Sequence, residues 1–366
     1  MKLYGHLDRL LLREMARLFA ATLGGVVLIY LVIDFADRAH GFTGRAWGKP
    51  AAELYLNKAA VVGYQLAPAA LIIAAALLIS LLGRRGELTA MLSVGVRPLR
   101  LALPVAAFAA LLGVALFWLN EKVVVRASAR IDEIQVKRFG SWGDWATYHA
   151  GSSWLRGQNG RIYHLGPQRD GGWEPATVLE LAKPFRLTRR LVARRLEPDG
   201  AHGLKFIDVL EIRYGPSKEP GGDIAERHLE VLREEFPESA SDLLLRSGRP
   251  QQLPFWQLRE QVRLREQSGQ PAREFELAIS ERIAQPLQEV PAALAALGIS
   301  IWLQRPRRRV PVSAAVALGI GLSLALWAAS VVVHALAMGG GLPPWAAAAV
   351  PGALSTLWAV VTFRRG

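Results

Sequence analysis

Long uncharged runs of apolar residues divide this chain, and no other feature restricts its fold as strongly. Three runs precede a long polar middle and the rest follow it; they are Leu18–Ile33, Ala59–Leu82, Leu101–Leu119, Ala292–Leu303 and Val310–Phe363. A helix needs roughly 20 apolar residues to cross the hydrocarbon core of a bilayer, where backbone groups must pair with one another. The last run is long enough for two helices, and the glycines and prolines of Gly339–Pro344 favour a turn between them. The sequence therefore predicts six transmembrane helices, three on each side of an insert.

Basic residues beside these runs set the predicted orientation. They gather at the start of the chain, in two of the short loops and at its end: Lys2, Arg9, Arg13, Arg17, Arg84, Arg85, Arg97, Arg100, Arg305, Arg307, Arg308, Arg309, Arg364 and Arg365. Because basic loops stay on the cytoplasmic side, we expect both termini and these two loops to be cytoplasmic. The protein is then a multi-pass protein of a bacterial inner membrane, and its insert is periplasmic. The expected division is residues 1–120, 121–282 and 283–366.

Composition excludes several classes of function. The net charge is +13, but 51% of the residues are hydrophobic, which is too apolar for a basic nucleic-acid binder. The chain has no cysteine, so disulfides, thiol catalysis and thiolate metal sites are excluded. Its seven histidines lack the spacing of metal ligands, and no phosphate-binding G-x-x-x-x-G-K-[ST] loop is present. We therefore expect no metal, cofactor or catalytic residue, and a protein that is not itself an enzyme.

The first part of the insert predicts an antiparallel β-domain. Short β-like segments occur with turn residues between them: Trp154–Arg156, Arg161–Leu165, Thr177–Ala182, Arg186–Leu196 and Leu204–Tyr214. Several short strands at this spacing suggest a sandwich or an open jelly-roll-like sheet. Residues 215–253 are charged and show little periodicity, and Phe255–Gln267 then has the pattern of an amphipathic helix.

The loop near residues 84–98 is the most distinctive short segment. Glu87 to Val94 can form a two-turn helix, with a carboxylate at its N-terminus, Gly95 as its C-terminal cap and Pro98 to stop it. Leu88, Met91 and Leu92 would form a small apolar face. Such a helix suits docking into a groove on a soluble partner, and it equally suits a plain connector against the headgroups.

Other polar residues in or near the spans leave two interpretations each. Arg38, Arg45, Lys49 and Lys58 lie in a loop predicted to be outside, either as solvated charge or as contacts to an anionic headgroup. Glu289 either lines a cavity or marks the outer interface, and His334 either joins two helices or relays a proton. Glycines at Gly24-Gly25 and Gly319-Ile320-Gly321 favour close helix packing.

Six short motifs in order resemble the permease family of lipopolysaccharide export, LptF/LptG, more closely its G-type subunit. They are Leu7-Asp8-Arg9-Leu10, Arg85-x-Glu87-Leu88-x-x-Met91-x-x-x-Gly95, Asn120-Glu121, Trp154-Leu155-Arg156, Gln285-Pro286-Leu287, and Gly341-Leu342-Pro343-Pro344 with Arg364-Arg365. The resemblance covers the whole chain, including the order of helices and insert.

The resemblance implies an ABC transporter. Two such permeases pair in the inner membrane, dock on a dimeric cytoplasmic ATPase, and pass lipopolysaccharide to a periplasmic bridge protein with the same β fold. By this resemblance, the loop near residues 84–98 is a coupling helix. The residues that would contact the ATPase are Glu87, Arg84, Arg85, Leu88, Met91 and Gly95. Cations at the outer rim would attract the phosphates of lipid A; the candidates are Arg38, Arg45, Lys49, Lys58, Lys122, Arg126 and Arg130.

One position departs from the family pattern. G-type members tend to carry a basic residue near the outer end of the first helix, where this chain has Asp34. A carboxylate there repels phosphate unless it pairs with Arg38 or binds a divalent cation.

Two other functions compete with lipid export: a membrane-anchored periplasmic scaffold or sensor, and a secondary transporter driven by protons through Glu289, Asp34 or His334. A coupling helix has no role in either.

Overall fold

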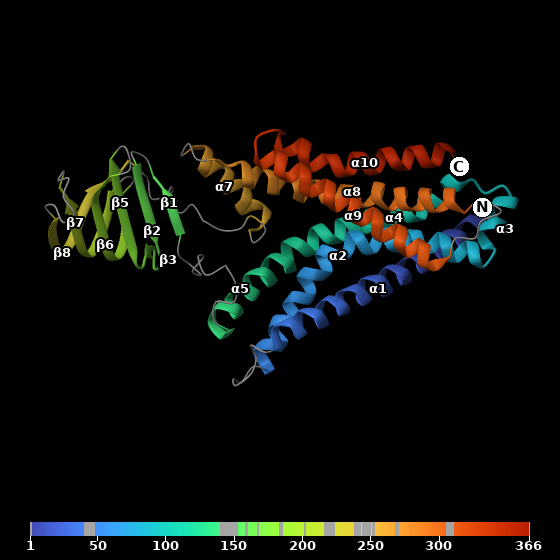
Figure 1. The fold of residues 1–366 in the computed structure, drawn as a ribbon, viewed down its shortest axis with the longest axis horizontal. Coiled ribbons are helices and arrows are strands. Elements are labelled where there is room, and N and C mark those ends of the chain that lie inside the picture. Colours follow the sequence, from blue (N-terminus) through green and yellow to red (C-terminus); the bar gives the residue numbers. More distant parts are fainter. Residues whose placement is uncertain are drawn as a thin grey trace. The chain divides into compact units, whose positions relative to one another are not determined.

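The computed structural model describes residues 2–39, 48–139, 153–157, 160–166, 168–182, 186–200, 203–215, 224–237, 243, 250, 253–267, 271–304 and 311–365. They fall into two compact units. The helical unit comprises Met1–Ile131, Pro250–Arg259 and Arg273–Gly366, and the β unit comprises Asp132–Arg249 and Glu260–Ala272 (Figure 1). Six long apolar helical stretches and an antiparallel sheet inserted between them confirm the predicted fold class.

The helical unit contains α1 (Lys2–Arg38), α2 (Gly48–Arg84), α3 (Glu87–Ser93), α4 (Pro98–Leu119), α8 (Arg273–Leu303), α9 (Val312–Met338) and α10 (Pro344–Arg365). A π-helical turn, η2 (Asn120–Val124), joins α4 to α5 (Val125–Phe139). Both ends of the chain and the short α3 lie at one end of the unit, which we call the terminal end (Figure 1). The opposite end, where α1 ends and α8 begins, is called the insert end.

Charged residues extend several helices beyond their uncharged runs. The run Ala59–Leu82 is the centre of a 37-residue helix, α2, so Lys49 and Lys58 lie on a helix rather than in a loop. Similarly, α8 begins at Arg273 and includes Pro286 and Pro291. Hydrophobicity marks the part of a helix that sits in hydrocarbon, whereas hydrogen bonding continues the helix past that part.

The core of the helical unit lies along α2 and α8. Helix α2 contacts α1, α8 and α9, while α8 contacts α2, α4 and α10. A methyl group built on Gly319 of α9 would lie 2.7 Å from the Ile73 backbone of α2, so glycine permits this close approach. No described atom lies within 4 Å of the corresponding positions at Gly24, Gly25 or Gly321.

Two membrane helices keep an uncovered apolar surface. None of the residues in the most apolar 18-residue window of α1 is buried, and only 6% of the corresponding window of α9 is buried. On α1 this surface includes Leu28, Ile29 and Ile33, which are each more than 60% exposed. In a membrane, such a surface faces lipid or another protein.

The β unit holds one antiparallel sheet. Its strands are β1 (Ser153–Arg156), β2 (Arg161–Leu165), β3 (Gln168–Arg169), β4 (Gly172–Trp173), β5 (Ala176–Ala182), β6 (Arg186–Asp199), β7 (Gly203–Tyr214) and β8 (Ile224–Glu235). They follow the order β1-β2-β5-β6-β7-β8 (Figure 1). Strand β4 pairs with β6 beside β5, and β3 pairs with β4. The five predicted strands are confirmed, as is the amphipathic helix α7 (Phe255–Gln267).

Strand β8 was missed because its sequence does not alternate between apolar and polar residues in the usual way. Most of its side chains are exposed, and among the described strands it pairs only with β7. The core beneath the sheet is formed by one side of the inner strands, with Tyr163, Leu191 and Phe206 fully buried. A charged edge strand carries little hydrophobic signal, so the pattern of residues 215–253 did not indicate a strand.

Candidate functional site

The segment at the terminal end that connects α2 to α4 has the predicted local structure. Helix α3 begins at Glu87 and ends at Ser93. Gly86 and Gly95 flank it with φ values of 76° and 86°, a left-handed conformation that glycine adopts at little cost. The amide of Val96 donates to the carbonyl of Met91, which closes the C-terminal turn. Both glycines therefore fix the direction in which α3 leaves α2 and enters α4.

The apolar side of α3 packs mainly against its own chain. Leu88 is 2% exposed and belongs to the main core of the helical unit, and Met91 packs against that core. Leu92 is 38% exposed and Val94 is 84% exposed. The predicted three-residue face is thus divided: two residues anchor the helix and Leu92 remains on the surface.

Charged contacts hold the surroundings of α3 to α1. Arg85 lies 3.2 Å from a carboxylate oxygen of Glu14, and Arg100 lies 2.7 Å from one of Asp8. Arg84 ends α2 and is exposed. Glu87 is half-buried, and within the described residues no hydrogen bond or ion pair involves its carboxylate. The arrangement leaves one carboxylate at the N-terminus of an anchored surface helix.

At the insert end, two of the predicted cations, Arg38 and Lys58, bond to the carboxylate of Asp34. Its carboxylate accepts hydrogen bonds from Lys58 at 2.6 Å, Tyr55 at 2.9 Å and Arg38 at 3.2 Å. Lys58 is only 8% exposed. Because two cations meet one carboxylate, the cluster keeps an excess positive charge despite the acidic residue. Asp34 is paired with Arg38, which is one of the two arrangements that the sequence analysis named as preventing repulsion of phosphate.

The other predicted cations are spread around this end. Arg130 on α5 lies 2.6 Å from Glu53 on α2, with both side chains nearly half exposed. Lys49, Lys122 and Arg126 are exposed on α2, η2 and α5. Arg45 lies outside the described residues.

A buried ion pair joins η2 to α8. The Arg282 side chain is 7% exposed and donates to Glu121 at 2.8 Å and to the Leu253 carbonyl at 2.7 Å. The second oxygen of Glu121 accepts the Phe255 amide at 2.9 Å. The π-helical turn shifts the register of α4 where Glu121 occurs, and such turns often occur at functional sites. The sequence drew attention to Asn120-Glu121 but gave no indication of its partner.

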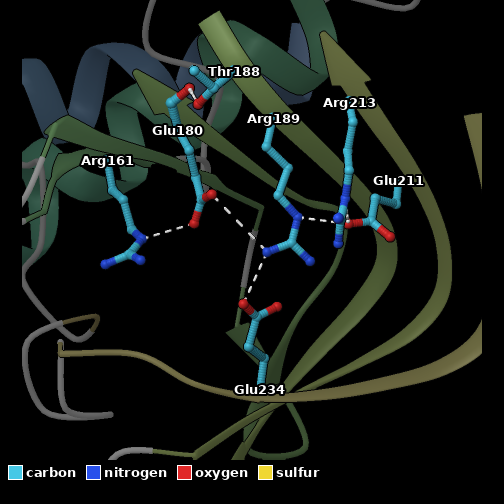
Figure 2. A network of polar contacts seen from close by, with 7 residues as sticks. All are labelled: Arg161, Glu180, Thr188, Arg189, Glu211, Arg213 and Glu234. Carbon is cyan, nitrogen blue, oxygen red and sulfur yellow. Dashed lines mark hydrogen bonds and ion pairs between the residues drawn. The ribbon is translucent and has the colours of Figure 1, made fainter. Parts of the chain in front are cut away.

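Figure 2 shows a charge network on the core side of the sheet. Arg189 on β6 lies at its centre, 2.7 Å from Glu211, 2.8 Å from Glu234 and 4.0 Å from Glu180. Arg161 donates to Glu180 at 2.9 Å, and Arg213 donates to Glu211 at 2.8 Å. The sequence analysis did not bring these side chains together, because the acids come from three strands other than β6.

The network shifts two pKa values. Burial alone would raise the pKa of Glu211, but the hydrogen bonds and charges of Arg213 and Arg189 outweigh it and lower the pKa below 4.5. Burial alone would lower the pKa of Arg189, but Glu234, Glu211 and Glu180 raise it. Both groups are therefore held in their charged forms. Within the described ranges, no group of three or more His, Asp or Glu side chains could hold a metal ion.

Comparison with known protein families places this sequence beside one of them. The sequence model of a family described as "Lipopolysaccharide export system permease LptF/LptG" matches residues 9–365. This range includes all six membrane helices and the insert between them. No curated protein matches the chain.

Proposed function

The chain belongs to the LptF/LptG family of lipopolysaccharide export permeases, and we propose that it is the permease subunit of an ABC transporter in the bacterial inner membrane. In this role it extracts lipopolysaccharide from that membrane and passes it to a periplasmic bridge. The observation that carries the proposal is the family match over residues 9–365, on a chain with six membrane helices around a β insert. A cytoplasmic ATPase dimer supplies the energy.

We infer that the terminal end is cytoplasmic and the β unit periplasmic. Arginines beside the helices at the terminal end support this orientation, by the positive-inside rule. Helix α3 is then on the side where ATP is available.

Coupling to the ATPase is assigned to α3. A coupling element must transmit force, so its fixed attachment through Leu88 and the two capping glycines supports this role. Glu87 offers an unpaired carboxylate among the described residues, and Leu92 and Val94 offer apolar surface beside it. Arg84 and Arg85 flank the docking surface, while Met91 and Gly95 hold its shape.

The anionic headgroup is assigned to the insert end. Arg38 and Lys58 retain excess positive charge around Asp34, and Lys49, Lys122 and Arg126 provide exposed cations on neighbouring helices. Phosphates bind guanidinium and ammonium groups through charge-assisted hydrogen bonds. Arg45 and Arg130 complete the proposed set.

The remaining surfaces suit the other partners. The uncovered apolar side of α1 supports pairing with a second permease of the same family. The exposed edge strand β8 supports addition of a strand from a bridge protein with the same β fold.

The test is Glu87→Lys in cells that depend on this chain for export. We expect lipopolysaccharide export to fail while the protein still inserts and melts normally, because the new cation repels the partner's docking groove. Glu260→Lys makes the same charge change on an exposed position of α7 and serves as the matched control. Unchanged export by Glu87→Lys would count against a coupling role for α3.

Co-purification separates this function from its competitors. Protein extracted in mild detergent should bring with it an ATPase, a second permease and bound lipid A. A protein that is recovered alone in several detergents would favour a membrane-anchored scaffold or a proton-driven transporter.

A further inference from the structure

Three polar residues lie on one side of α8 inside the helical unit. Arg282, Gln285 and Glu289 are spaced three and four residues apart, so their side chains project from the same side of the helix. The first two have partners on other elements: Arg282 pairs with Glu121, and Gln285 accepts a 2.6 Å hydrogen bond from the Tyr64 hydroxyl of α2. This side of α8 therefore faces η2 and α2.

Glu289 differs from its two neighbours. Its side chain is 2% exposed, and its Oε2 atom is buried with no hydrogen-bond partner among the described residues. No ion pair or hydrogen bond within the described ranges involves this carboxyl. It lies in a helix that is long and apolar enough to cross a membrane.

Charged groups near Glu289 do not offset an ionised carboxylate. The titratable residues facing this side are Tyr64 on α2, Glu121 on η2 and Arg282 on α8 itself, and Arg282 is already engaged by Glu121. Three further helices pack on α8. Helices α4 and α10 carry charged residues only near the terminal end, namely Arg100, Arg364 and Arg365, and His334 of α9 is paired with Glu281.

Energetics favour the neutral form of this side chain. An ionised carboxylate that is buried without a counter-charge loses its hydration and gains no compensating interaction, which makes this form costly. A protonated carboxyl of the same size carries no net charge and costs less to bury.

We propose that Glu289 is a proton-binding site inside the permease. A proton binds one carboxylate oxygen, forming one O–H bond, and no other bond is made or broken. The closed packing of α2 against α8 belongs to the proton-bound form, because the ionised form requires water or a cation beside it. Pro286 and Pro291, on either side of Glu289, remove backbone donors from α8 and provide points at which the helix can bend to admit water.

Infrared difference spectroscopy of the full-length protein in lipid tests the site directly. A protonated carboxylic acid has a C=O stretching band that an ionised carboxylate lacks. We expect such a band at neutral pH in the natural protein and in Glu281→Gln, and its loss in Glu289→Gln. Glu281 lies two turns earlier on α8, is about 42% exposed and pairs with His334, so it provides the matched Glu→Gln control.

These measurements test proton binding by Glu289 independently of whether the protein exports lipopolysaccharide. Absence of the band from the natural protein, or its persistence in Glu289→Gln, would overturn the proposal. Glu289→Asp should retain a band at a shifted frequency, which guards against loss of the signal through misfolding of the Gln variant. Raising the pH should abolish the band reversibly, and a Glu289→Gln protein should show no corresponding pH-dependent step in thermal unfolding.

Discussion

The ammonium group of Lys58 lies 2.6 Å from the carboxylate of Asp34, and this bond joins the insert ends of α1 and α2. Side-chain exposures of 10% and 12% place it among the better protected ion pairs of the helical unit. Asp34 also holds Arg38 and Tyr55, so one carboxylate organises three donors. The cluster explains how an acidic residue occupies a position where a basic one was expected.

Replacing Asp34 should destabilise the protein more than replacing Lys58. Asp34→Asn leaves Lys58 buried without a counter-charge, which we expect to cost about 3 kcal/mol. Lys58→Met should cost less, because Asp34 keeps Arg38 and Tyr55 as partners. Thermal unfolding of both purified variants checks the order. Equal melting temperatures for the two variants would contradict the expected order.

Gly319 and Gly321 should respond differently to the same substitution. Gly319→Ala places a methyl group 2.7 Å from the Ile73 backbone and forces α2 and α9 apart, at an expected cost of about 1–3 kcal/mol. Gly321→Ala meets no described atom within 4 Å and is the matched control. The melting temperature should fall only for Gly319→Ala; a similar fall for both would show that the close approach to Ile73 is not the cause.

Acid should loosen the β unit through Glu211. Its pKa is lowered in the folded state, so the ionised form contributes stability above its ordinary value of 4.5. That contribution is lost as the pH falls below 4.5 and through the lower folded pKa. Arg189→Met removes a partner, so the folded pKa should rise and this pH dependence should shrink.

Pulse proteolysis of the full-length protein with an acid-active protease, across this pH range, measures the effect. Cleavage within β6–β8 should increase steeply for the natural protein and less steeply for Arg189→Met, which is more susceptible from the start. The matched control is Arg194→Met, because Arg194 is 74% exposed and lies 3.8 Å from its partner Asp208. Identical pH profiles for all three proteins would remove Glu211 as the cause.

Charge removal at the Arg282–Glu121 pair should release the segment before α7. Arg282→Leu leaves Glu121, which is partly buried, without its cation, at an expected cost of about 3 kcal/mol. The double variant Arg282→Leu with Glu121→Leu should recover much of this stability. Hydrogen exchange of the Phe255 amide, which donates to Glu121, should accelerate in both variants because that acceptor is displaced or lost. Protection that is unchanged in the double variant would mean that another contact holds the segment.

Local patterns predicted the local structure well. Gly86 and Gly95 stand on either side of α3 with positive φ values, and the helix between them starts at the predicted residue. Strands such as Arg161–Leu165 were found from alternation and flanking turns. Strand β8 was missed because its exposed, charged side chains carry no burial pattern. The sequence also did not predict which residues of the α3 apolar face are buried, because burial of Leu88 depends on helices that lie elsewhere in the chain.

Hydrophobic length alone determined the number of membrane helices, the place of the insert and the multi-pass character of this protein. These properties depend on each segment's own partition between hydrocarbon and water, which the sequence states directly. Only the tertiary structure decided which polar side chains meet. Lys58 bonds to Asp34, which is 24 positions away in the sequence. The partners Arg282 and Glu121 are 161 positions apart, and Tyr64 and Gln285 are 221 positions apart. The same packing leaves Glu289 without a partner among the described residues. Contacts between helices, rather than distance along the chain, decide which side chains become neighbours.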